Sequence, residues 1–182
     1  MDDSLALINS TLANTPAADP DRIAILGFSR GGGVGLLMSA RDTRIDAVVE
    51  FFGPTDFYDT FARDIIEDAL AGDVRDLPGV PMLNERYLQP FRLGNLSLAE
   101  MRRQLLLRSP AQFANRLRAV QVHHGTEDNV VNVSQAQSLI DKLQALGREP
   151  PAFEFYIYAG GQHDPNTLTG SVQRTVAYLG RI

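Results

Sequence analysis

The chain lacks cysteine altogether and contains only three histidines. Without cysteine there can be no disulfide bond, thiolate zinc site or cysteine nucleophile. The histidines also lack the usual ligand spacing, so we expect neither a metal nor another cofactor. No apolar run approaches the ~18 residues needed to span a bilayer, and no basic cluster is present. We therefore expect no membrane and no nucleic acid among the partners.

What the chain does contain is enough apolar material for one folded unit. It has 182 residues, of which 44% are hydrophobic, and a net charge of −5 at pH 7. This length predicts a single domain over residues 1–182. The N-terminus is acidic and has no basic or apolar region of the signal-peptide type, which predicts a cytoplasmic protein unless a leader precedes this segment.

Apolar runs between glycine and proline residues predict four strands, at 22–26, 45–52, 120–124 and 152–158. Helical spacing of apolar residues predicts helices at 3–14, 30–40, 134–146 and 167–180. This alternation predicts an α/β fold, a mostly parallel sheet with helices on both faces. The 57–108 segment is different, with helical pieces broken at Gly72, Pro78–Pro81 and Pro90. We interpret it as a helical lid inserted into the domain.

A serine between glycines follows the first predicted strand, in the segment Gly27-Phe28-Ser29-Arg30-Gly31-Gly32. The Gly-x-Ser-x-Gly pattern between a strand and a helix is typical of a nucleophile elbow, in which the serine lies at the tip of a strained turn. The other interpretations are a glycine-rich turn and an anion-binding loop. A phosphate-binding domain is disfavoured because no Lys-Ser or Lys-Thr follows the glycines.

The ends of the four predicted strands carry the remaining polar candidates. In parallel sheets the reactive side chains gather at the carboxyl ends of the strands. Those ends are followed, in chain order, by Ser29, Asp56, Asp128 and His163. A serine, then an acid, then a histidine is the chain order of one known type of hydrolytic triad.

Three blocks of this sequence resemble the triad blocks of α/β-hydrolases: residues 27–32, residues 124–131 and residues 160–163. Within that superfamily they look most like the prolyl-oligopeptidase and dienelactone-hydrolase-like branch. Its second block reads His-Gly-x-x-Asp-x-x-Val, which places the family's acid on Asp128. His163 follows Asp128 by 35 residues, a spacing similar to that of the family. The resemblance covers most of residues 1–56 and 109–182, and nothing specific in 57–108.

The resemblance implies a serine hydrolase that cleaves an ester or peptide bond through an acyl-enzyme. Ser29 would be the nucleophile and His163 the general base. Asp128 would hold the imidazole of His163 in the required tautomer. The backbone N–H of Arg30 would donate one hydrogen bond to the oxyanion, while the Arg30 side chain is expected to form a surface ion pair or to bind a substrate carboxylate. The substrate would be a small ester or peptide.

Several alternatives for these roles stay open. Three other acids are candidates for the triad: Glu127, Asp56 and Glu50. Asp164 is expected to begin a helix rather than to act in the reaction. His123 and His124 point to opposite faces of a strand, and we expect one of them to pack against the Asp128 loop.

The sequence departs from the family pattern before the elbow. α/β-hydrolases have further strands there, and one of the early loops supplies a second oxyanion donor. Here only one predicted helix precedes the strand at 22–26, which leaves one edge of that strand open. We expect a second copy of the chain, as in a homodimer, or a missing N-terminal segment to cover that edge. The alternative function is a truncated, weakly active or inactive hydrolase-like module that binds a ligand or partner.

Overall fold

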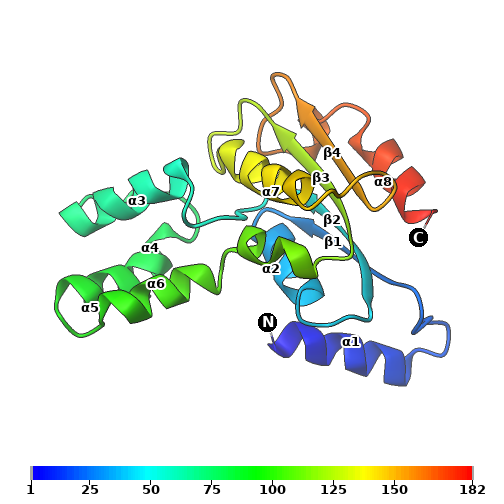
Figure 1. Cartoon of the computed structure of the whole chain (residues 1–182), viewed down its shortest axis with the longest axis horizontal. Coiled ribbons are helices and arrows are strands. Elements are labelled where there is room, and N and C mark those ends of the chain that lie inside the picture. Colours follow the sequence, from blue (N-terminus) through cyan, green and yellow to red (C-terminus); the bar gives the residue numbers. More distant parts are fainter. Residues whose placement is uncertain (1, 182) are drawn as a thin grey trace.

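A computed structural model describes residues 2–181 and shows a four-stranded sheet (Figure 1). The strands lie in chain order: β1 (Ile23–Phe28), β2 (Ile45–Phe51), β3 (Ala119–Gly125) and β4 (Phe153–Tyr158). All three neighbouring pairs are parallel. Parallel strands need crossover connections, and helices supply most of them here. The predicted α/β fold with a parallel sheet is confirmed.

Helices cover both faces of the sheet. The first face is covered by α2 (Arg30–Ser39) and α7 (Ser134–Ala145), with α1 (Asp2–Asn14) packed at its margin. The second face is covered by α8 (Ser171–Leu179), whose Tyr178 is fully buried. Each fully buried leucine or isoleucine stabilises such a core by about 1.5–3 kcal/mol. The sheet is therefore a rigid support for the loops at its carboxyl edge.

The helix predicted at 167–180 begins later than expected. Residues Pro165–Thr167 instead form a short 3-10 helix, capped by the Asp164 side chain, which accepts a hydrogen bond from the N–H of Asn166. Gly170, with φ of 80°, then turns the chain into α8. A positive φ costs glycine little, so the chain can redirect at this point.

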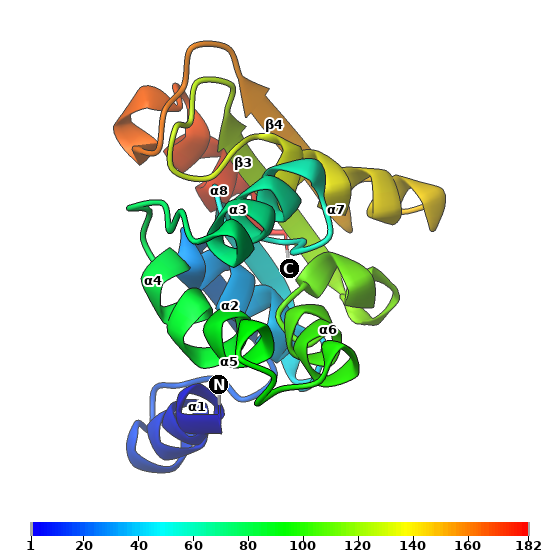
Figure 2. The same cartoon turned by 90° about the vertical axis from the view of Figure 1, so that its left-hand side faces the viewer.

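The 57–108 segment contains the predicted helical pieces. They are α3 (Thr60–Ala71), α4 (Val80–Leu83), a π-helical turn (Asn84–Leu88), α5 (Gln89–Arg92) and α6 (Leu98–Leu106). These helices bury their own apolar cluster, which includes Leu83, Leu88 and Leu105. Figures 1 and 2 show α3 to α6 as a group beside the sheet. The segment has a small core of its own and does not add to the sheet's two faces.

The predicted break at Pro90 is wrong. Helical structure runs from Val80 to Arg92 without interruption, and Pro90 lies inside α5. Proline lacks the N–H that would bond to the carbonyl one turn earlier. The π-helical turn directly before α5 changes that bonding pattern, and the fully buried Leu88 anchors the turn in the local apolar cluster.

β1 is one edge of the sheet that the described residues form. Its side chains Leu26 and Phe28 are 49% and 43% exposed, although both are large and apolar. Exposed apolar edges are normally covered in native proteins.

Across residues 2–181, no helix has both the length and the apolar character needed to cross a membrane.

Candidate active site

Ser29 lies at a sharp turn between β1 and α2. Its φ of 51° and ψ of −126° are unusual for any residue other than glycine, so the backbone is strained there. The N–H of Ser29 donates to the carbonyl of Phe51 on the neighbouring strand, at 2.8 Å. At Gly27 a Cβ would lie only 2.5 Å from the carbonyl oxygen of Gly31, so the close approach of strand and helix requires glycine. The turn has the form of a nucleophile elbow.

Asp128 and His163 lie together at the ends of β3 and β4. The Asp128 side chain is buried, and its Oδ1 accepts hydrogen bonds from the backbone N–H groups of Val130 and Val131, both at 2.8 Å. Its Oδ2 accepts from Nδ1 of His163 at 2.7 Å. A carboxylate held on three sides fixes both the orientation of the imidazole and the tautomer with a proton on Nδ1. This leaves Nε2 of His163 free to take a proton.

His124 is the strand histidine that packs against the Asp128 loop. Its Nε2–H donates to the carbonyl of Val131 at 2.8 Å, and Oδ2 of Asp128 lies 3.5 Å away. Burial lowers the pKa of His124, so the ring is neutral and acts as a support. His123 points to the other face, stacks on Phe51 with ring centroids 4.4 Å apart, and has a pKa lowered to about 3 by burial.

Phe52 is a site residue that the sequence patterns did not reveal. It directly follows β2, and its φ of 43° is the second positive value found at a residue other than glycine among residues 2–181. Its ring packs against His163, with centroids 4.4 Å apart. The strained backbone thus aims an aromatic ring at the imidazole. No local sequence signal marks such a conformation, since phenylalanine at the end of a strand is ordinary core.

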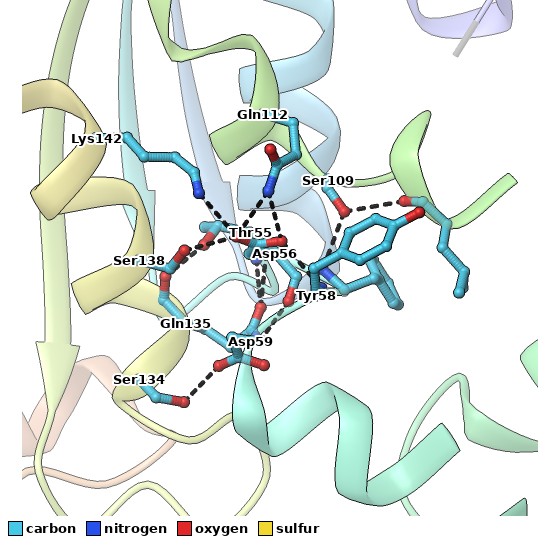
Figure 3. A network of polar contacts seen from close by, with 12 residues as sticks. Thr55, Asp56, Tyr58, Asp59, Ser109, Gln112, Ser134, Gln135, Ser138 and Lys142 are labelled. Carbon is cyan, nitrogen blue, oxygen red and sulfur yellow. Dashed lines mark hydrogen bonds and ion pairs between the residues drawn. The ribbon is translucent and has the colours of Figure 1, made fainter. Parts of the chain in front are cut away.

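Asp56, a rival candidate for the acid, is engaged elsewhere (Figure 3). Its carboxylate accepts hydrogen bonds from Gln112 at 3.0 Å, from Ser138 at 2.7 Å and from Lys142 at 3.2 Å. Burial raises the pKa of Asp56, but the hydrogen bonds outweigh it and hold the pKa below its usual value. Asp56 therefore fastens the start of the 57–108 segment to α7 and makes no contact with His163.

The other acids are also placed away from the imidazole. Glu50 is fully buried beneath the elbow and accepts a hydrogen bond from the N–H of Gly53 at 2.8 Å. Glu127 is exposed, and its backbone N–H bonds to Gly161. Asp164 caps the 3-10 helix. Within residues 2–181, Asp128 is the one carboxylate bonded to His163, and no group of three acids or histidines could hold a metal.

An apolar cavity of about 220 Å³ opens beside Ser29. Its walls come from α3, from α4 and from the loop after Asp128, including Phe61, Val80 and Val131. The network around Gln135 holds the adjoining backbone: its Oε1 accepts from the N–H groups of Thr55 and Asp56. The cavity thus joins the serine to the 57–108 segment.

Ser29 and His163 are not hydrogen-bonded to each other in the part of the chain that the structure describes. The structure therefore brings Asp128 and His163 into contact, and it places Ser29 at the same edge of the sheet without that last hydrogen bond.

Known proteins resemble this chain in sequence and in fold. A related protein from Mycobacterium tuberculosis, named probable carboxylic ester hydrolase LipM, is 26% identical over 151 residues, which are 74% of this chain and 31% of that protein. A puromycin-hydrolyzing peptidase of the same organism superimposes with a TM-score of 0.71 at 23% identity, over 98% of this chain and 24% of its own. Acetyl xylan esterase 1 from Thermoanaerobacterium sp. superimposes with a TM-score of 0.65 at 20% identity, over 97% of this chain and 50% of the esterase.

The structural matches show the fold, and the chain spans half or less of the length of each of these proteins. All three are named as enzymes that hydrolyse esters or peptides. The sequence model of the BD-FAE family matches residues 10–143, which is most of the chain and includes the elbow and the Asp128 loop. The resemblance to α/β-hydrolases is confirmed, and the chain belongs to the BD-FAE family of α/β-hydrolase-type domains.

Proposed function

We propose that this chain carries the catalytic centre of a serine hydrolase that cleaves an ester or peptide bond through an acyl-enzyme. The observation that carries the proposal is the 2.7 Å hydrogen bond from His163 to the buried Asp128, at the sheet edge where Ser29 occupies its strained turn. A serine hydroxyl is a poor nucleophile by itself, so it needs a base that is oriented toward it.

The geometry supports a definite role for each group. Ser29 Oγ attacks the substrate carbonyl while Nε2 of His163 takes the hydroxyl proton. The same proton then goes to the leaving alcohol or amine as the carbonyl–oxygen or carbonyl–nitrogen bond breaks. A water molecule, activated by the same Nε2, hydrolyses the acyl-enzyme. Asp128 stabilises the imidazolium that forms in both steps.

The backbone N–H of Arg30 is the proposed oxyanion donor. It belongs to the first turn of α2, where N–H groups have no partner within the helix and the helix dipole favours negative charge. One donor missing from such a site lowers the rate by about 10²–10³. We assign no second donor within residues 2–181, so we expect a slow but measurable reaction of this chain by itself.

A fluorophosphonate probe tests the proposal, because it bonds covalently to an activated serine. We expect intact mass spectrometry to show one adduct on the chain, and none on Ser29→Ala. If the folded chain is not labelled, or if Ser29→Ala is labelled equally, the proposed function is wrong. The first of these results would favour a hydrolase-like module that binds a ligand or partner.

We also propose that the β1 edge is covered in the native protein, either by a second copy or by a further segment of the same protein. The half-exposed Leu26 and Phe28 support this proposal. If a second copy covers the edge, light scattering after size exclusion is expected to give a dimer mass that falls to a monomer mass in Leu26→Lys. If the chain stays monomeric at high concentration and its β1 amide hydrogens exchange slowly with deuterium, both forms of the proposal are wrong.

A further inference from the structure

The cavity beside Ser29 is placed to receive the acyl half of a substrate. This step rests on the proposed hydrolase function. In that reaction His163 protonates the leaving group, so the leaving group must lie against His163. The cavity is lined by Ser29 but not by His163, so the acyl group is the half of the substrate that it can hold. Its walls, including Phe61, Ile65 and Val80, are apolar.

Arg30 is the one charged residue that lines this cavity. From the sequence, its side chain is expected either to form a surface ion pair or to bind a substrate carboxylate. Arg30 is exposed, and within residues 2–181 its side chain makes no ion pair or hydrogen bond. No residue in the described part of the chain therefore pairs with the guanidinium of Arg30.

The position of Arg30 is also unfavourable for the helix that holds it. It is the first residue of α2, where the helix dipole disfavours a cation, and no acidic residue in that turn compensates. An arginine at this unfavourable position beside Ser29 would be explained if its side chain binds the substrate. The guanidinium and the helix N-terminus together make the mouth of an apolar cavity positive.

We propose that the cavity is an acyl pocket for chains that are apolar along their length and end in a carboxylate, which Arg30 binds. The apolar walls take up the carbon chain, and the guanidinium pairs with the carboxylate at the rim. Guanidinium and carboxylate form charge-assisted hydrogen bonds that a neutral chain end cannot make. The specificity therefore comes from one end of the acyl chain, and the scissile bond is the same in both kinds of substrate.

A matched pair of esters tests this pocket: 4-nitrophenyl hexanoate and mono-4-nitrophenyl adipate, whose acyl chains have equal length and differ by a terminal carboxylate. We expect kcat/KM to favour the adipate ester by about tenfold, between the values for exposed and buried charge pairs. Arg30→Gln should remove that preference, and added salt should weaken it in the unchanged chain. Using the ratio of the two esters cancels any change in the oxyanion contact that both share.

Arg86→Gln is the matched control, because Arg86 is exposed and does not line the cavity. It is expected to keep the preference for the adipate ester. Equal kcat/KM values for the two esters, or a preference that survives in Arg30→Gln, would overturn the inference while the hydrolase function stands. If neither ester is cleaved and no fluorophosphonate adduct forms, the proposed function fails and the acyl pocket fails with it.

Discussion

Replacing Asp128 with asparagine is expected to lower kcat by about 10⁴, without loss of the fold. Oδ1 of Asp128 accepts two backbone hydrogen bonds, so the oxygen of an asparagine would keep that place. Its amide nitrogen would then face Nδ1 of His163, where Oδ2 lies now. An amide N–H donates to Nδ1 and forces the imidazole proton onto Nε2. In that tautomer Nε2 cannot take the proton of Ser29, which gives the loss of rate.

The rate can be measured with 4-nitrophenyl acetate, with the free energy of unfolding measured in parallel. Asp56→Asn is the matched control, because Asp56 is a buried carboxylate at a strand end that bonds to Gln112, Ser138 and Lys142 and not to His163. It is expected to destabilise the fold and to change kcat far less than Asp128→Asn. If Asp56→Asn causes the larger loss of kcat at equal folding, the acid of the triad is Asp56 and our assignment is wrong.

The sheet could be predicted because its signals are local. The strand at 45–52 is a largely apolar run that ends at Gly53-Pro54. Glycine and proline act on the local backbone, so this signal does not depend on distant contacts. Ser29, Asp56, Asp128 and His163 became candidates for a similar reason, since each follows a predicted strand and parallel strands end at one edge. The resemblance to the family's second block then favoured Asp128 as the acid. Position after a strand was informative here because it fixes where a residue lies before any packing is known.

The features that could not be predicted depend on packing between distant segments. Pro90 is tolerated in α5 because it follows a π-helical turn, and Leu88 of that turn is buried in the apolar cluster formed by the other helices of the 57–108 segment. The contact of Phe52 with His163 depends on a positive φ at Phe52, and a positive φ at a phenylalanine cannot be predicted from the residue type. Asp56 and Asp128 both follow predicted strands, so position alone did not separate them, and only the family block favoured Asp128. The hydrogen bonds that reach each carboxylate show which of the two is bonded to His163.

Glu50 is a carboxyl group buried in the core beneath the elbow. It lies in β2 with no exposed surface, and its Oε2 accepts from the N–H of Gly53. Its Oε1 has no hydrogen-bond partner among the described residues. A Cβ built on Gly32 would lie 3.0 Å from Oε2, so the carboxyl group packs directly against the first turn of α2. Burial raises the pKa of Glu50 to about 8, opposed in part by the hydrogen bond from Gly53.

This raised pKa makes the stability depend on pH in a defined direction. The ordinary pKa is 4.5, so below pH 4.5 the carboxyl is neutral in both the folded and the unfolded chain. Between pH 4.5 and about 8 the unfolded chain loses the proton while the folded chain keeps it, and stability falls. One pKa unit corresponds to about 1.4 kcal/mol, so the total loss is on the order of 5 kcal/mol.

Glu50→Gln is therefore expected to raise the free energy of unfolding by up to about 5 kcal/mol at pH 9, and by little near pH 4.5. Glutamine keeps the shape and the oxygen that accepts from Gly53, and it cannot ionise. Urea denaturation of both proteins across this pH range measures the difference. Other titrating groups, such as His123, are common to both proteins and cancel. Glu85→Gln, at an exposed position, should show no such trend, and a Glu50→Gln difference that stays constant from pH 5 to 9 would show that Glu50 is not held neutral beneath the elbow.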